Sequence, residues 1–271
     1  MTTRPVPAVL SIAGSDSGGG AGIQADLKAF ARCGVHGMTA ITAITAQNTI
    51  GVEVVESVSP RIIVAQVRAV AEDIGVDAVK IGMLGTVETV DAVVEALGYV
   101  GEAPVVIDPV MVAESGAVLL DQDARQALVE RLLPMTTVAT PNIPEARELT
   151  GAGEGSTQED LARDMLALGP KSVVVTGGHS ERLVDLFFDG EEPVEIPGER
   201  HPDGAAHGSG CTHSSTLAAC LARGASPLQA AEAARRVASA AVGAGLRDLG
   251  KGPGPVDVFD LTARLVSRFG P

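Results

Sequence analysis

Two hydrophobic patterns alternate along this chain. Short, uninterrupted apolar runs, such as residues 8–13, are typical of strands buried on both faces of a sheet. In the segments between them, apolar residues recur every three or four positions, which predicts helices with one buried face. The strands predicted in this way are residues 8–13, 38–45, 78–81, 104–109, 137–140 and 172–176, followed by a hairpin formed by residues 183–188 and 193–197.

Several predicted helices carry recognisable start and stop signals. Ser156 and Glu159 have the spacing of a capping box, and the Gly-Pro pair at 169–170 ends the helix that this box begins. Ser226 and Gln229 form a second box ahead of a long alanine-rich segment. The predicted helices are residues 23–32, 60–73, 87–97 and 121–134, one starting at Pro144, one over 156–169, one from Cys211 to near Gly224, and one from 226 onward.

The alternation of strands and helices predicts the fold class. It favours an α/β fold with three layers, α/β/α, in which helices cover both faces of a mainly parallel central sheet. With 271 residues, 45% of them hydrophobic, we expect a single domain over residues 1–271. In such folds ligands bind beyond the carboxyl ends of the strands.

Charge and composition restrict the function further. A formal net charge of −14 argues against nucleic-acid binding, which normally needs a basic face. A small phosphate ligand remains compatible with this charge, because backbone amides can hold it. The three cysteines suit a reducing compartment, and we see neither a signal peptide nor an apolar run long enough for a membrane span. We therefore expect a cytoplasmic protein with no membrane partner.

The segment from His207 to Thr212 is the strongest candidate site. Its glycines, Gly208 and Gly210, allow the backbone to approach a ligand closely, and the segment opens a predicted helix. The first turn of a helix favours phosphates and oxyanions because its amides point outward and the helix dipole is positive there. Cys211 lies on this turn, where the pKa of a thiol is expected to be lowered.

Other interpretations of this segment stay open. A Gly-x-Gly before a helix is often only a tight connection, and cysteine is often a small buried hydrophobe. A Cys-His nucleophile pair is also possible. A metal site is a further alternative, although no Cys-x-x-Cys or His-Glu-x-x-His pattern supports it; its candidate ligands are His179, His201, His207, Cys211 and His213.

A second glycine-rich segment, residues 14–22, follows the first predicted strand and matches neither the dinucleotide-binding nor the Walker pattern. It is either a ligand loop or a flexible surface loop. Gln47 ends the neighbouring strand, where its planar amide could pair with the edge of an aminated heterocycle or could simply close the strand.

Three further polar residues lie at predicted strand ends. Asp108 is placed to reach a magnesium ion that bridges phosphates. Asn142 and Glu145 lie three residues apart at a strand-to-helix turn, where they could face one site. Alternatively, Asn142 caps the helix and Glu145 favours the helix dipole.

Together these segments resemble the hydroxymethylpyrimidine/phosphomethylpyrimidine kinases of thiamine biosynthesis, a family of the ribokinase-like superfamily. The matching segments are residues 13–26, 45–49, 80–84, 108–111, 140–146 and 177–179, with Gly210-Cys211-Thr212. The resemblance implies a ribokinase-like fold, a homodimer and two ATP- and Mg²⁺-dependent reactions. The first phosphorylates the hydroxymethyl group of the pyrimidine, and the second converts the monophosphate to the diphosphate.

The resemblance also implies residue roles. Cys211 matches the position of the catalytic base, where many ribokinase-like sugar kinases have aspartate, and the amides of Gly208, Ser209 and Gly210 would stabilise the transferred phosphoryl group. The pyrimidine site would comprise Gly14, Asp26, Gln47, Met83 and His207. The ATP and phosphate site would comprise Asp108, Asn142, Glu145, Thr176 and Gly178, with Asp108 and Glu145 also placing Mg²⁺.

Two positions depart from the family pattern. Thr176 stands where members commonly have lysine, and Ala205-Ala206 stand where Asn-Thr is usual. The first change removes one positive charge that is expected near the phosphates. The missing lysine leaves a non-catalytic pyrimidine or nucleotide sensor as one alternative. A pyridoxal kinase is another, because related enzymes phosphorylate a hydroxymethyl group on a similar heteroaromatic ring.

Overall fold

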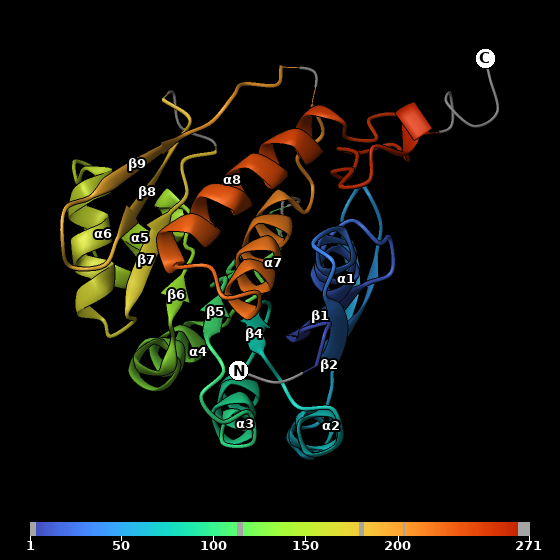
Figure 1. Cartoon of the computed structure of the whole chain (residues 1–271), viewed down its shortest axis with the longest axis vertical. Helices are drawn as coiled ribbons and strands as arrows, with labels where there is room; N and C mark the ends of the chain where they lie inside the picture. Colours follow the sequence, from blue (N-terminus) through green and yellow to red (C-terminus); the bar gives the residue numbers. More distant parts are fainter. Residues whose placement is uncertain (1–3, 113–115, 179–181, 203, 265–271) are drawn as a thin grey trace.

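The computed structural model describes residues 4–112, 116–178, 182–202 and 204–264, which are built around a nine-stranded sheet (Figure 1). The order across the sheet is β3-β2-β1-β4-β5-β6-β7-β8-β9. The strands from β2 to β7 in this order run parallel, and β3, β8 and β9 are antiparallel to their neighbours. The strands are β1 (Ala8–Asp16), β2 (His36–Gln47), β3 (Val52–Ser57), β4 (Ala78–Ile81), β5 (Val105–Ile107), β6 (Val138–Ala139), β7 (Ser172–Val175), β8 (Val184–Phe188) and β9 (Val194–Pro197).

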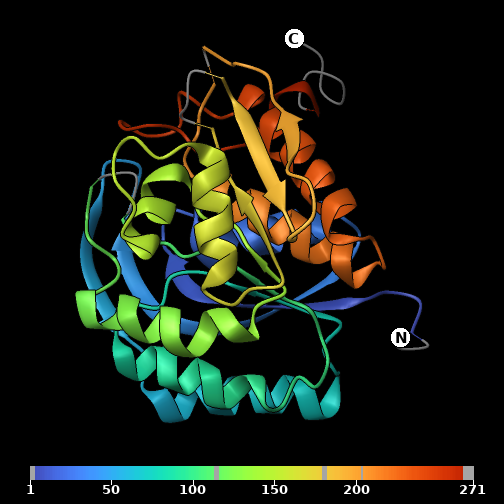
Figure 2. The same ribbon diagram turned by 90° about the vertical axis from the view of Figure 1, so that its left-hand side faces the viewer.

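Helices cover both faces of this sheet (Figures 1 and 2). One layer consists of α1 (Gly22–Arg32), α7 (Ser209–Ala222) and α8 (Pro227–Gly243), and the other of α2 (Pro60–Asp73), α3 (Val87–Leu97), α4 (Gln122–Ala127), α5 (Ile143–Thr150) and α6 (Gln158–Ala167). Adjacent residues of β4 pack on opposite faces of the sheet: Ala78 belongs to the hydrophobic core under α7, and Val79 belongs to the core under α3. The predicted three-layer α/β/α fold with a mainly parallel sheet is confirmed.

Two strand predictions need correction. The first strand does not end before Gly14, because Ser15 and Asp16 still pair with β2 beyond a bulge. The sequence pattern also missed β3, which forms the edge of the sheet and is mostly exposed. An exposed edge strand needs no apolar run, so hydrophobicity alone does not reveal it.

Helix starts were predicted with mixed accuracy. The box of Ser226 and Gln229 is confirmed. The box predicted at Ser156 is wrong by one residue, because Thr157 caps α6 and its amide donates a hydrogen bond to Asp160 Oδ2 at 2.9 Å. The pairs Ser156/Glu159 and Thr157/Asp160 both have the spacing of a capping box, and only the backbone geometry distinguishes them. The predicted helix 121–134 is divided into α4, a π-helical turn over 128–132 and a 3₁₀ turn over 133–135. Among the described residues, no helix is long and apolar enough to cross a membrane.

Candidate active site

A cavity of about 590 Å³ opens at the carboxyl ends of the parallel strands. Its walls come from the ends of β1, β2 and β4, from the loops after β5, β6 and β7, and from the first turn of α7. This is the edge at which the sequence predicted a ligand site. Of the predicted site residues, the following line the cavity: Gly14, Gln47, Met83, Asp108, Asn142, Glu145, Thr176, Gly178, His207, Gly208, Ser209, Gly210 and Cys211.

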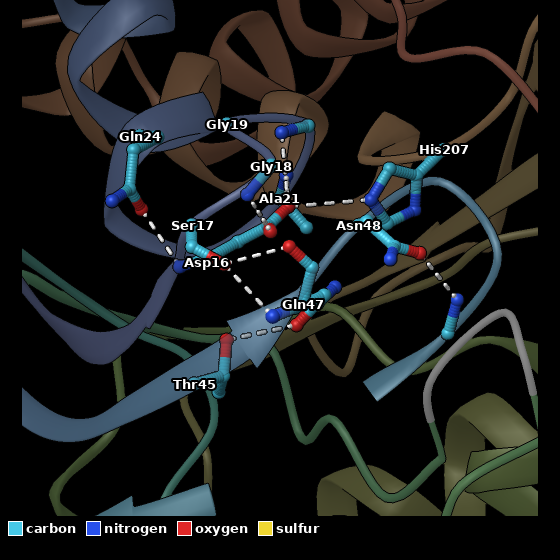
Figure 3. A network of polar contacts seen from close by, with 12 residues as sticks. Asp16, Ser17, Gly18, Gly19, Ala21, Gln24, Thr45, Gln47, Asn48 and His207 are labelled. Atoms are coloured by element: carbon cyan, nitrogen blue, oxygen red, sulfur yellow. Dashed lines mark hydrogen bonds and ion pairs between the residues drawn. The ribbon is translucent and has the colours of Figure 1, made fainter. Parts of the chain in front are cut away.

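Asp16 organises the glycine-rich loop after β1 (Figure 3). Its carboxylate accepts hydrogen bonds from the amides of Gly18, Gly20 and Ala21 at 2.7, 2.9 and 2.8 Å. Its Oδ2 also lies 3.4 Å from His207 Nε2. Burial raises the pKa of Asp16, but the hydrogen bonds from His207 and the amides outweigh this, so the net shift is downward. A buried carboxylate therefore holds this loop, and the alternative of a flexible surface loop is wrong.

The two glycine-rich loops touch each other through positions that exclude a side chain. A Cβ at Gly20 would lie 2.2 Å from His207 Cδ2, and a Cβ at Gly208 would lie 1.8 Å from the carbonyl oxygen of Gly20. Gly208 also has φ of +83°, a left-handed conformation that favours glycine. The close approach brings the start of α7 directly against the loop after β1.

Gln47, Met83 and Gly14 form one end of the cavity. Ser17 holds the Gln47 backbone, because its Oγ accepts from Gln47 N at 2.8 Å and donates to Gln47 O at 2.6 Å (Figure 3). Thr45 Oγ1 donates to Gln47 Oε1 at 3.3 Å. Met83, which follows β4, packs closely against the neighbouring strand β1: a Cβ at Gly14 would lie 3.1 Å from the sulfur of Met83. A planar amide and an apolar wall together suit a flat heteroaromatic ring.

Asp26 lies behind the cavity and holds Lys80. Lys80 Nζ donates to both carboxylate oxygens of Asp26, at 2.8 and 3.0 Å, and both side chains are fully buried. Ser11 and Ser215 donate to the same carboxylate at 2.5 and 2.7 Å. Lys80 lines the cavity and Asp26 does not. Asp26 therefore reaches the cavity only through Lys80, and the role at the pyrimidine that the resemblance implies for Asp26 stays a prediction.

Cys211 lies in the first turn of α7, among charged neighbours. Burial raises the pKa of its thiol to about 12; the charge of Lys80 opposes this shift, whereas Asp26 and Asp108 add to it. The prediction of a lowered pKa is therefore wrong for the ligand-free protein. Burial and the two carboxylates outweigh the helix terminus. Burial by itself lowers the pKa of Lys80, but Asp26, Cys211 and Asp108 raise it, so this lysine is charged.

Asp108 and Glu145 place two acidic groups on the cavity wall. Asp108 Oδ2 accepts a hydrogen bond from Ser214 Oγ at 3.1 Å. Glu145 Oε2 accepts from Asn142 N at 2.9 Å, and Asn142 Oδ1 accepts from Glu145 N at 2.8 Å. This reciprocal pair is a capping box, so the cap interpretation of both residues is confirmed, while both also face the cavity.

The electrostatics of these acids suit a divalent cation. Burial, followed by the charge of Asp108, raises the pKa of Glu145 to about 8. Burial also raises the pKa of Asp108, against the opposing charge of Lys80. Carboxylate oxygens are hard ligands, and Mg²⁺ is commonly bound by one or two of them together with phosphates. The donor set therefore fits Mg²⁺, which would relieve the repulsion between the two acids.

The alternative of a zinc-like histidine and cysteine cluster has no support. Within the ranges that the structure describes, no group of three or more His, Cys, Asp or Glu side chains is arranged to hold a metal. His201 contacts Ser239 Oγ at 2.9 Å, and His213 Nε2 lies 3.4 Å from Asp185. His179 lies outside the described residues.

Thr176 and Gly178 line the opposite end of the cavity, after β7. The Thr176 amide donates to Pro141 O at 2.8 Å, which joins the ends of β6 and β7. Ala205 and Ala206 are the second departure from the family pattern. Ala206 lines the cavity, whereas Ala205 is buried and its amide donates a hydrogen bond to Val242 O at 3.1 Å. Neither departure interrupts the fold.

The fold and this cavity define a class: kinases of ribokinase-like fold that act on small molecules. The sequence model of the family described as phosphomethylpyrimidine kinase matches residues 16–257. The chain therefore belongs to the phosphomethylpyrimidine kinase family, and it is a phosphotransferase.

Individual relatives agree with this assignment. The hydroxymethylpyrimidine/phosphomethylpyrimidine kinase of Rhizobium meliloti is 49% identical over 256 residues, covering 92% of this chain and 96% of that protein. A thiamine biosynthesis bifunctional protein of Geobacter sulfurreducens is 44% identical over 257 residues, covering 93% of this chain and 52% of that protein. Among solved structures, an ADP complex of Bacillus subtilis pyridoxal kinase is similar, with a TM-score of 0.86, 39% identity and coverage of 95% of this chain and 99% of that chain.

Sequence reasoning assigned no role to two residues that the structure places at the site. Lys80 is a charged residue inside an otherwise apolar strand, and such residues are rarely buried without a partner. That signal was available. Asp16 is one polar residue within a glycine-rich segment, and nothing in its sequence context distinguishes it from a turn residue. Only the folded loop reveals that three amides converge on it.

We predict that Glu145→Gln stabilises the ligand-free protein increasingly as the pH rises. Glutamine keeps the capping box. Below pH 4.5, the ordinary pKa of the group, the Glu145 carboxyl is protonated in the folded and in the unfolded protein. Between pH 4.5 and about 8 it is ionised in the unfolded chain but still protonated in the folded protein. Wild type therefore loses stability relative to the variant across this interval. The measurement compares melting temperatures with EDTA at about pH 6 and about pH 8.

Glu148→Gln is the matched control, because Glu148 is an exposed acid on the same helix. Its effect on the melting temperature should not grow with pH in this way. If Glu145→Gln and Glu148→Gln show the same pH dependence, Glu145 is an ordinary ionised carboxylate.

Proposed function

We propose that this chain transfers the γ-phosphoryl group of ATP to the hydroxymethyl group of 4-amino-5-hydroxymethyl-2-methylpyrimidine. It then phosphorylates the monophosphate to the diphosphate, as a step of thiamine biosynthesis in a one-domain enzyme. The family assignment and the printed names of the relatives support this reaction. The observation that carries the proposal is one cavity that joins the Gln47 end to the Thr176 end past Cys211.

The first turn of α7 lies between the two halves of this cavity. On one side Gly208 contacts the loop after β1, and on the other a Cβ at Gly210 would lie 3.7 Å from Asp108 Oδ2. A pyrimidine held by Gln47 and Met83 would therefore present its hydroxymethyl group near Cys211. Phosphates held near Asp108 and the amides of Gly208, Ser209 and Gly210 would face it. This arrangement serves phosphoryl transfer, in which positioning and electrostatic stabilisation supply most of the catalysis.

In the first reaction the hydroxyl oxygen attacks the γ-phosphorus, the bond to the ADP oxygen breaks, and Cys211 accepts the hydroxyl proton as a thiolate. The raised pKa of Cys211 means that the thiolate must be favoured by positive charge at the site. Lys80 supplies one such charge. Mg²⁺ bound by Asp108 and Glu145 would supply another and would neutralise the phosphates.

We also propose a cytoplasmic homodimer. Cys33, Cys211 and Cys220 are free thiols, which suits a reducing compartment. Ile44 and Val54 are each 56% exposed. Ala46, two residues along β2 from Ile44, is paired with Val54 on the edge strand β3, so these three side chains share one face. Exposed apolar edges commonly associate with another chain, so this face supports pairing with a second copy.

The function is tested by ADP release with Mg²⁺-ATP and, in separate reactions, the hydroxymethylpyrimidine, its monophosphate and pyridoxal, with products identified by mass. We expect phosphorylation of the first two. The pyridoxal arm is included because a structural neighbour that is 39% identical is a pyridoxal kinase. Activity on pyridoxal alone would indicate a pyridoxal kinase. Absence of turnover with all three substrates would favour a non-catalytic sensor.

Cys211→Ala should lower turnover in the first reaction by at least about a hundredfold, with pyrimidine binding nearly unchanged, because a positioned base is lost. The second reaction should lose less, since a phosphate monoester is already largely ionised near pH 7 and gives up no hydroxyl proton. Steady-state kinetics of each step measure this difference.

Cys220→Ala is the matched control, because Cys220 lies on the same helix outside the cavity lining. It should leave both reactions close to wild type. Near-normal turnover of Cys211→Ala in the first reaction would rule out the assignment of Cys211 as the base.

Gln47→Ala should weaken pyrimidine binding by about tenfold and ATP binding far less, because a hydrogen bond worth about 1.5 kcal/mol to the ring is lost. Calorimetric titration with each ligand separately measures both affinities in one variant. Equal losses for the two ligands would mean that Gln47 does not contact the ring.

A further inference from the structure

The cavity carries several acids but few buried cations to meet a polyphosphate. Lys80 is committed to Asp26 by two hydrogen bonds. Arg200 lines the cavity from an exposed position in the loop after β9. Arg235, on α8, lines it with a side chain that is only 11% exposed. Arg235 therefore places a mostly buried guanidinium on the cavity wall.

Several elements hold this guanidinium in place. Nη2 donates to the carbonyl oxygen of Leu183, a non-glycine residue with φ of +49°. The amide of Gly198 donates to the same oxygen at 2.9 Å. A Cβ at Gly198 would lie 1.9 Å from Arg235 Nη2, so only glycine leaves room for the arginine. The start of β8 and the end of β9 thus form a slot for this one side chain.

The slot directs Arg235 toward the end of β7. Nη1 lies 3.3 Å from Asp185 Oδ1, and the amide of Gly177 donates to that same oxygen at 2.9 Å. A Cβ at Gly178 would stand 4.0 Å from Nη1. Arg235 therefore borders the end of the cavity at which Thr176, an uncharged residue, follows β7.

The hydrogen-bonding capacity of Arg235 is incompletely used. Among the described residues, Nε is buried and has no hydrogen-bond partner. The Asp185 carboxylate is shared with His213 as well as with Gly177 and Arg235. Arginine presents five donors in a rigid plane and is suited to phosphate oxygens.

We propose that Arg235 binds the phosphate chain of the nucleotide and supplies the positive charge that Thr176 does not. Asp185 and the Leu183 carbonyl hold the guanidinium in position, so that it meets phosphate oxygens beside Gly178. The inference rests on the proposed kinase function, because it assigns a residue to the nucleotide of that reaction.

The test compares a phosphate-bearing ligand with a phosphate-free one. In calorimetry with Mg²⁺, Arg235→Gln should bind the β,γ-methylene analogue of ATP about tenfold to a hundredfold more weakly, because a charge-assisted hydrogen bond is lost. Stabilisation of the melting temperature by adenosine should be unchanged. Arg236→Gln, on the exposed neighbouring position of α8, should leave both readouts unchanged.

A double variant provides a rescue. Thr176→Lys, introduced into Arg235→Gln, places a cation at the same end of the cavity, from the segment after β7 in place of α8. It should recover at least about threefold of the lost affinity for the analogue. A role of Arg235 limited to anchoring the β8–β9 hairpin would not be rescued in this way.

The outcomes separate the two proposals. If Arg235→Gln binds the analogue as wild type does, or weakens adenosine and the analogue equally, the inference is overturned while the kinase function stands. If wild type itself does not bind the analogue, the proposed function fails, and the inference fails with it.

Discussion

The buried Asp26 carboxylate connects the elements on which the site depends. It lies on α1 and receives Lys80 from β4, Ser11 from β1 and Ser215 from α7. Removing one partner of a buried ion pair typically costs about 3–5 kcal/mol, because the other charge is left uncompensated. This cost ties α1 to β4, and the hydrogen bond from Ser215 to Asp26 connects α7, and hence Cys211, to the same cluster. The same pair holds the charged Lys80 side chain at the cavity wall.

The ionisable groups of the ligand-free cavity lack compensating charge. Two acids with raised pKa values and a thiol with a pKa of about 12 surround a single buried lysine. Each of these groups is costly to ionise without a compensating charge. A cation and a nucleotide that enter together would change the balance for all of them.

Close backbone approach is the second constraint on the site. The loop after β1 and the start of α7 are nearly two hundred residues apart in sequence, yet Gly20 and Gly208 are in contact. The Asp16 carboxylate binds the backbone amides of the loop after β1, and it binds the loop before α7 through His207. The two loops therefore form a single rigid wall. This contact fixes the start of α7 relative to the loop after β1.

Local patterns in the sequence were enough to predict the three-layer fold and the edge of the sheet that carries the cavity. These follow from local periodicity and from the rule that parallel strands end at one edge. The folded chain was needed to reveal the upward shift of the Cys211 pKa, the position of Asp26 behind Lys80, the slot for Arg235 and the edge strand β3. Burial and partner charges come from residues distant in the chain, so a local pattern contains no information about them. The helix terminus at Cys211 was visible in the sequence, whereas the desolvation that overrides it was not.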